Sequence, residues 1–123
     1  MKLNLENILK ELKSYRERKA VIDPTHAALL VIDIQNFFHR MVRPVMGNIQ
    51  NVIQFCRQEN IPIIFTQHGH TDSPSDSGAL GAWWGQIILH GTKDWQFLPE
   101  VTVESIDTVL PKKALQCFLR DRP

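Results

Sequence analysis

The spacing of apolar residues changes along the first third of the chain. Residues 4–19 place leucine and isoleucine at i, i+3, i+4 and i+7 with lysine and arginine on the other side, which predicts an amphipathic helix. After the turn-forming residues Asp-Pro-Thr at 23–25, residues 27–33 read Ala-Ala-Leu-Leu-Val-Ile-Asp. An apolar run without alternation predicts a strand covered on both faces, as in parallel sheets.

Helical spacing returns between residues 47 and 60, and a second apolar run follows at 61–66. The residues on one helical face are Ile49, Val52, Ile53 and Cys56. Pro62 ends the helix and stands at the start of the second strand, where its missing N–H matters least. Strand, helix and strand form a βαβ unit with parallel strands. Residues 107–110 predict a third, short strand.

Candidate chemistry follows the ends of these predicted strands. Asp33 follows the first, residues 67–70 (Gln-His-Gly-His) follow the second, and Lys112 follows the third. Ligands bind beyond the carboxyl ends of parallel strands, so we expect these groups to share one edge of the sheet. Residues 67–91 also make a polar loop that is long for a mere connection and is typical of functional loops.

Length and composition restrict the class of protein. The chain has 123 residues, 43% of them hydrophobic and 22% charged, as expected for one folded domain. A net charge of +1 with both signs mixed gives no electrostatic case for nucleic acid or an anionic membrane. The apolar runs are too short to span a bilayer, and the N-terminus does not resemble a signal peptide. Two cysteines make no disulfide framework, so we expect a cytoplasmic protein.

Asp33 and Lys112 are the candidate catalytic pair. A carboxylate at the mouth of a dry strand needs a cationic partner, and Lys112 could supply it. Such a lysine could steady an ionised nucleophile or a developing anion. The alternatives are a capping or turn aspartate and a solvated lysine pair at 112–113.

His68 and His70 are candidate ligands for zinc or iron. We expect the two imidazoles to meet at one ion only if the loop turns at Gly69. Candidates for a third ligand are Asp72, Asp76 and His90. The alternative is a pair of histidines that hydrogen-bond within the loop.

The tryptophans and cysteines also have two interpretations each. Trp83 and Trp84 could wall a planar substrate, or they could cover a core or a subunit contact. Cys56 lies on the apolar helix face and is interpreted as a buried core thiol.

Four separated motifs resemble the isochorismatase-like cysteine hydrolases, in that family's order. Residues 28–38 (Ala-Leu-Leu-Val-Ile-Asp-Ile-Gln-Asn-Phe-Phe) resemble the opening strand and its Asp-x-Gln-Asn-x-Phe ending. Residues 62–68 resemble the second-strand motif, and 78–84 with Gly91-Thr92 resemble the loop of nicotinamidase-like members. The resemblance covers residues 20–113, about half of a typical family domain. It implies a three-layer α/β/α fold with a parallel, Rossmann-like sheet, here truncated to about three strands.

The resemblance also implies roles for single residues. The family uses an Asp-Lys-Cys triad to hydrolyse a small amide or a related C–N bond. Asp33 matches the general base and Lys112 the lysine. The implied substrate contacts are Gln35, Phe38, Gln67 and Trp84. The intact family also implies a homo-oligomer.

The chain departs from the family at two places. Nicotinamidases continue from the glutamine as Asp-Trp-His and hold a metal, whereas this chain has His68-Gly69-His70. The lysine should be followed by two variable residues and then Tyr-Ser-Ala-Phe, but residues 115–118 are Leu-Gln-Cys-Phe, so only Phe118 agrees. The family's cysteine, in a Gly-Val-x-Thr-x-x-Cys context, has no match, and Cys117 does not resemble it.

A shifted reading frame would account for the last ten residues. One possible set of codons for residues 114–123 is GCG-CTA-CAG-TGC-TTT-TTA-CGG-GAC-CGA-CCT, which encodes Ala-Leu-Gln-Cys-Phe-Leu-Arg-Asp-Arg-Pro. Read from its second base, the same string encodes Arg-Tyr-Ser-Ala-Phe-Tyr-Gly-Thr-Asp-Leu, which is the family pattern. We therefore expect residues 1–113 to be the N-terminal part of a hydrolase domain and residues 114–123 to be an aberrant tail.

The sequence leaves two candidate functions open. The first is a nicotinamidase-like hydrolase whose chain lacks the nucleophile and is inactive. The second is a non-catalytic fragment that pairs its open sheet edge with another polypeptide.

Overall fold

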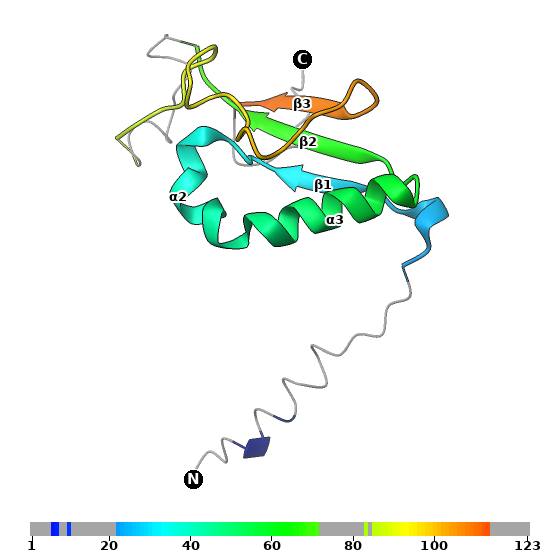
Figure 1. The fold of residues 1–123 in the computed structure, drawn as a ribbon. Helices are drawn as coiled ribbons and strands as arrows, with labels where there is room; N and C mark the ends of the chain where they lie inside the picture. The colour runs from blue at the N-terminus through cyan, green and yellow to red at the C-terminus, as the bar shows by residue number, and fades with distance from the viewer. Residues whose placement is uncertain (1–5, 8–9, 11–21, 72–82, 84, 114–123) are drawn as a thin grey trace, which may run out of the picture.

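The computed structural model describes residues 6–7, 10, 22–71, 83 and 85–113 (Figure 1). Its centre is a sheet of three strands, β1 (Leu29–Ile32), β2 (Ile63–His68) and β3 (Thr108–Lys112). The order is β1-β2-β3, and both pairs are parallel. The predicted α/β class and the parallel sheet are confirmed.

Two strands end later than predicted. The register pairs Leu29 with Ile63 in one ladder and His68 with Lys112 in the other. Gln67 and His68 are therefore the last residues of β2, and Lys112 is the last residue of β3. The expectation that they follow the strands is wrong. Ladder pairing with a neighbour extends both strands beyond their apolar runs, and a single strand's pattern does not reveal this.

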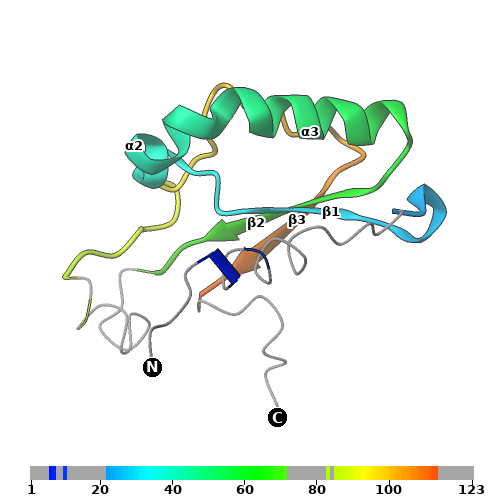
Figure 2. The ribbon, with the colours of Figure 1, turned by 90° about the horizontal axis from the view of Figure 1, so that it is seen from below.

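One face of the sheet packs under α3 (Met46–Gln58), as Figure 2 shows. Phe65 is fully buried at the centre of β2, and Ile53 and Cys56 of α3 are buried in the same core. Burial of one such large apolar side chain stabilises the fold by about 1.5–3 kcal/mol. Cys56 is a core thiol, as predicted. Val52 is 47% exposed, so its placement on the buried helical face is wrong.

The chain reaches α3 through short helical turns that follow β1. These are η2 (Asn36–Phe38), α2 (His39–Val42) and η3 (Arg43–Val45). Before β1, Asp23 accepts a hydrogen bond from the Thr25 amide at 2.9 Å and begins η1 (Pro24–His26), which is the predicted turn.

Arg57 fastens the C-terminal end of α3 to the segment before β3. Its guanidinium lies 2.9 Å from Glu104 and 2.8 Å from Asp107, and it also donates to the Thr102 carbonyl at 2.7 Å. The Asp107 carboxylate accepts the Glu104 amide as well, at 2.8 Å. This network fixes the start of β3 beneath the helix.

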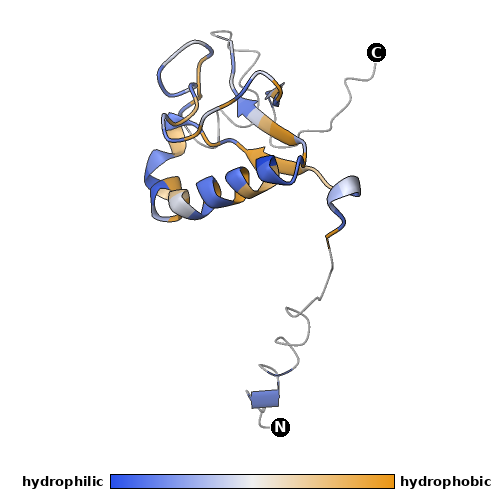
Figure 3. Cartoon of the chain, turned by 45° about the vertical axis from the view of Figure 1, so that its right-hand side comes forward, coloured by the Kyte–Doolittle hydropathy of each residue, from blue (hydrophilic) through white to orange (hydrophobic). Residues whose placement is uncertain are grey.

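The sheet face opposite α3 carries both exposed and buried side chains in the described part of the chain. Ile32 is 53% exposed there, whereas its neighbour Thr66 is fully buried. The strands are mostly apolar in Figure 3, and α3 carries both polar and apolar residues. Coverage of β1 on both faces stays a prediction, because the described residues do not include the segments at 11–21, 72–82 and 114–123.

Several expectations fall on other parts of the chain. The predicted helix at 4–19 lies mostly outside the described residues, and so does the tail at 114–123. The boundary at residue 113 stays a prediction. Among the described residues, no helix has the length and apolar character needed to cross a membrane.

Candidate active site

Asp33 and Lys112 meet at the carboxyl edge of the sheet. The Lys112 Nζ atom lies 2.6 Å from Asp33 Oδ2, and the two side chains are only 6% and 17% exposed. Their strands are separated by β2, so the lysine chain spans two strand spacings, roughly 10 Å, to reach the carboxylate. The prediction that Asp33 and Lys112 lie close together at this edge is confirmed. A partly buried charge pair of this kind keeps each charge from being desolvated alone.

Thr66 holds the Asp33 carboxylate from beneath. Its hydroxyl donates to Asp33 Oδ1 at 2.7 Å and accepts from the Asp33 amide at 3.1 Å, and Thr66 itself is fully buried. Sequence reasoning missed this residue, because a threonine in a strand is ordinary. The signal was the parallel register, which places Thr66 beside Ile32, directly before Asp33.

The backbone at Asp33 is held in an uncommon conformation. Its φ is 53°, in the left-handed region that non-glycine residues seldom adopt. A residue held there costs of order 1–3 kcal/mol, which the contacts around it must offset. The Asp33 carbonyl accepts the Gln35 amide at 2.8 Å, so the chain turns sharply here. The side chain contacts Thr66 and Lys112 and caps no helix, which removes the capping alternative.

Gln35 lies inside the protein and ties three segments together. It is fully buried, and its Nε2 donates to the carbonyls of His68 at 2.8 Å and Trp95 at 2.7 Å. Its Oε1 accepts the His68 amide at 2.8 Å. Gln67 also donates to the Trp95 carbonyl, at 3.1 Å, and is 7% exposed. Both amides are engaged by protein groups, and their predicted substrate contact stays a prediction.

Of the two predicted aromatic substrate contacts, the structure describes Phe38 but not Trp84. Phe38 is partly buried in η2 and packs edge-on against Phe37 at a centroid distance of 5.0 Å. Trp84 lies outside the described residues, while Trp83 is 75% exposed. A substrate role for Phe38 or Trp84 stays a prediction.

His68 and His70 lie side by side. Their Nε2 atoms are 3.1 Å apart, and both residues are buried. The expectation that the loop must turn at Gly69 is wrong, because alternate residues of an extended segment share a face. Gly69 has no positive φ.

The proton on this histidine pair can be assigned by hydrogen-bond accounting. His68 Nδ1 is buried without a partner. A buried acceptor without a partner is less costly than a buried N–H without one, so Nδ1 is the bare nitrogen and His68 donates through Nε2. Desolvation chiefly, then the neighbouring His70, lowers the pKa of His68, and Asp33 opposes that shift.

These histidines supply part of what a metal site needs. Two imidazoles with adjacent Nε2 atoms suit zinc or iron. The described residues hold no group of three histidine, cysteine or carboxylate side chains that could bind an ion. Asp72 and Asp76, two of the predicted third ligands, lie outside them. The described residues alone therefore do not make a metal centre, and the metal stays a prediction.

Gly69 gives space for Trp95, another residue that no motif pointed to. A Cβ atom on Gly69 would lie 2.6 Å from Trp95 Cδ1 and 2.8 Å from its Nε1. The indole therefore packs directly on the backbone beside the histidines. The Gly69 amide donates to the Lys112 carbonyl at 3.0 Å, so the same glycine keeps β2 and β3 together at the site.

The described residues include one cysteine, Cys56, which is buried in α3. It belongs to the core under the sheet, whereas Asp33 contacts Thr66 and Lys112 on the other face. Cys117 lies outside the described part. Among the described residues, the site therefore holds the Asp33–Lys112 pair and no thiol beside it.

Comparison with known proteins gives one family. The model of the isochorismatase domain matches residues 27–122. Nicotinamidase 3 from Arabidopsis thaliana is 38% identical over 113 residues, which cover 89% of this chain and 57% of that protein. Enterobactin synthase component B from Escherichia coli K12 is 30% identical, over 80% of this chain and 37% of that protein. The chain thus spans between about a third and somewhat over half of these relatives.

Solved structures show the same fold. A cysteine hydrolase from Pseudomonas syringae pv. phaseolicola superposes with a TM-score of 0.75 at 20% identity, over 82% of this chain and 53% of that one. N-carbamoylsarcosine amidase from Thermoplasma acidophilum gives 0.65 at 24% identity, over 76% and 55%.

Proposed function

This chain belongs to the isochorismatase family, and from that premise we propose that Asp33 and Lys112 are the acid–base pair of a hydrolase that cleaves a small amide or a related C–N bond. The observation that carries the proposal is the 2.6 Å contact between Lys112 Nζ and Asp33 Oδ2 at the carboxyl edge of the sheet. The nicotinamidase among the relatives supports a nicotinamide-like substrate.

Each member of the pair has a definite task in this proposal. The Asp33 carboxylate takes the proton of a cysteine thiol as general base, which makes the thiolate that attacks the amide carbonyl. It then carries that proton to the departing nitrogen. The Lys112 ammonium holds the aspartate ionised and stabilises negative charge as it develops on the substrate. Thr66 positions the carboxylate through its 2.7 Å hydrogen bond.

We also propose that this chain has no amidase activity by itself. Cys56 is packed in the core under α3, and the context of Cys117 is unlike the family's nucleophile. A frameshift near residue 114 would account for the departure. DNA sequencing tests this directly, because a shifted frame after codon 113 should encode a Gly-Val-x-Thr-x-x-Cys stretch.

An amidase assay tests the functional proposal. The purified chain and a frame-restored version are each given nicotinamide, and released ammonia is measured. We expect ammonia from the restored protein alone. Turnover by the short chain would contradict its proposed inactivity, and a restored protein without turnover on nicotinamide or other small amides would contradict the hydrolase assignment.

A second candidate function is an interaction module. The observation that favours it is an apolar groove of about 420 Å³ along the flank of α3 and the edge of β1 that has no neighbouring strand among the described residues. Ile32, Val45 and Val52 there are about half exposed. Size-exclusion chromatography with light scattering tests association through this groove, including a homo-oligomer. We expect Val52→Lys to release such a complex, with the exposed Gln54→Lys as control.

A further inference from the structure

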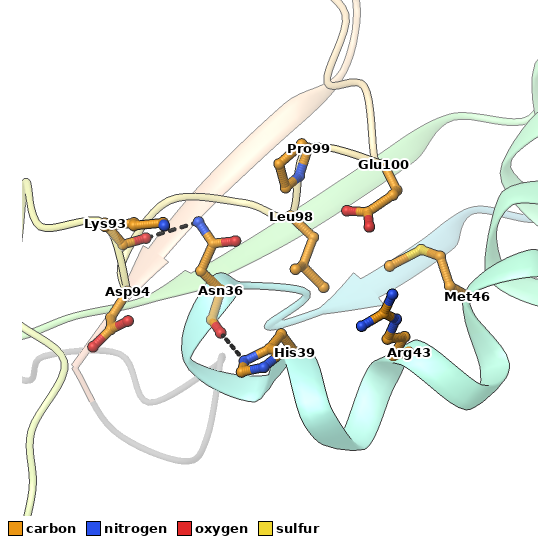
Figure 4. A pocket seen from close by; sticks show the side chains of 9 residues that line it. All are labelled: Asn36, His39, Arg43, Met46, Lys93, Asp94, Leu98, Pro99 and Glu100. Carbon is orange, nitrogen blue, oxygen red and sulfur yellow. Dashed lines mark hydrogen bonds between the residues drawn. The ribbon is translucent and has the colours of Figure 1, made fainter.

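A second cleft lies on the α3 side of the sheet, away from Asp33 and Lys112. It has a volume of about 460 Å³ and opens between the helical turns at 36–46 and the segment 93–100 (Figure 4). Its inner surface includes Leu98 and Met46, which are 6% and 8% exposed and belong to the core under α3. The cleft has no lining residue in common with the Asp33–Lys112 site.

The segment that forms one wall is fixed by hydrogen bonds at both ends. Asn36 Nδ2 donates to the Lys93 carbonyl at 2.8 Å, and Gln50 Nε2 of α3 donates to the Glu100 carbonyl at 2.9 Å. Between them, the Phe37 amide donates to the Asp94 carbonyl at 3.1 Å. The wall is therefore organised before any ligand arrives, which lowers the cost of binding.

Four charged side chains line the cleft, two of each sign. Arg43 and Glu100 lie toward the Met46 end in Figure 4, and Lys93 and Asp94 lie at the other end. Within the described part of the chain, none of the four forms an ion pair. The same connection pairs its charges farther along, where Glu104 and Asp107 hold Arg57.

This charge pattern selects among classes of small ligand. A simple anion would meet Glu100 and Asp94 as well as the cations, and a simple cation would meet Arg43 and Lys93. A ligand that carries both charges on one α-carbon can pair with the cation and the anion at one end of the cleft. The parts of Leu98 and Met46 that line the cleft then contact an apolar side chain.

We propose that this cleft binds a zwitterion of the α-amino-acid class. The ligand carboxylate faces the Arg43 guanidinium, its ammonium faces the Glu100 carboxylate, and its side chain lies over Leu98 and Met46. The proposal does not depend on the hydrolase assignment, because it uses none of the residues of that site.

Calorimetric titration of the full chain with L-leucine tests the proposal. For a ligand of this size in an open cleft we expect a Kd of about 1 mM. N-acetyl-leucine lacks the ammonium and leucinamide lacks the carboxylate, so each should bind at least about tenfold more weakly. Equal binding of leucine and either analogue, or no leucine binding at about ten times that concentration, would overturn the proposal.

Variants show whether the leucine is in this cleft. Arg43→Gln and Glu100→Gln should each weaken leucine binding at least about tenfold. Arg40→Gln and Glu59→Gln remove exposed charges of the same kind outside the cleft and should leave the Kd unchanged. Circular dichroism confirms that every variant is folded. Unchanged leucine binding by both cleft variants would overturn the proposal even if leucine binds elsewhere.

Discussion

Replacement of Thr66 by valine isolates the contact that positions Asp33. Valine has nearly the same shape as threonine, so the fully buried position stays filled while the hydroxyl is lost. The change removes the 2.7 Å hydrogen bond donated to Asp33 Oδ1 and the 3.1 Å bond accepted from the Asp33 amide. The carboxylate retains Lys112 at 2.6 Å, so the ion pair itself is not broken.

The size of the effect follows from the charge on the acceptor. A hydrogen bond to a charged group contributes about 1.5–3 kcal/mol, compared with about 1 kcal/mol between neutral groups. The Asp33 side chain is 17% exposed, so water recovers a part of the loss. We therefore expect Thr66→Val to lower the free energy of unfolding by about 2 kcal/mol, a large part of the stability of a small domain.

Urea unfolding followed by circular dichroism measures the effect, with Thr66→Ser as the matched variant. Serine keeps the hydroxyl and loses one methyl group, which costs about 1 kcal/mol. The expected order of stability is native chain, then serine variant, then valine variant. A valine variant as stable as the serine variant would show that the hydroxyl does not hold Asp33 as described.

Two further predictions concern the histidine end of the site. Gly69→Ala places a methyl group 2.6 Å from Trp95, and we expect a loss of about 1–3 kcal/mol in thermal or urea unfolding. Gly47→Ala, with nothing within 4 Å, should instead stabilise α3 by about 0.5–1 kcal/mol, and equal effects of the two would contradict the packing. Because the pKa of His68 is lowered by burial, the unfolded chain binds the proton more readily. Stability should therefore be full above about pH 6.5 and fall as the pH drops below it, by up to about 1.4 kcal/mol per unit. If the stability of His68→Gln falls by the same amount over this pH range, His68 is not the group that causes the decline.

The sequence was sufficient for the parts that depend on local pattern. Continuous apolar runs indicated the first two parallel strands, residues 107–110 indicated the third, and the rule for carboxyl ends placed Asp33 and Lys112 at one edge. Both inferences use only short stretches of chain and one general property of parallel sheets.

The parts that were missed depend on how distant segments align. Thr66 contacts Asp33 because the β1–β2 register sets Ile32 beside it, and Trp95 packs on Gly69 because a distant connection crosses the end of β2. Neither contact leaves a sequence motif. The exposure of Val52 has a similar cause. Val52 lies beside the edge of β1, where the described residues include no further strand to cover it, and the helical pattern alone cannot show this.

The most direct test of the catalytic pair uses a chimera in which residues 1–113 are joined to the remaining part of the Arabidopsis nicotinamidase. Its kcat for nicotinamide is measured with Asp33→Asn, Lys112→Met and, as control, Lys113→Met. We predict that the chimera is active and that the first two variants each lower kcat by about 10²–10⁴-fold while the control stays within a few-fold. An active chimera in which Asp33→Asn keeps its kcat would contradict the account.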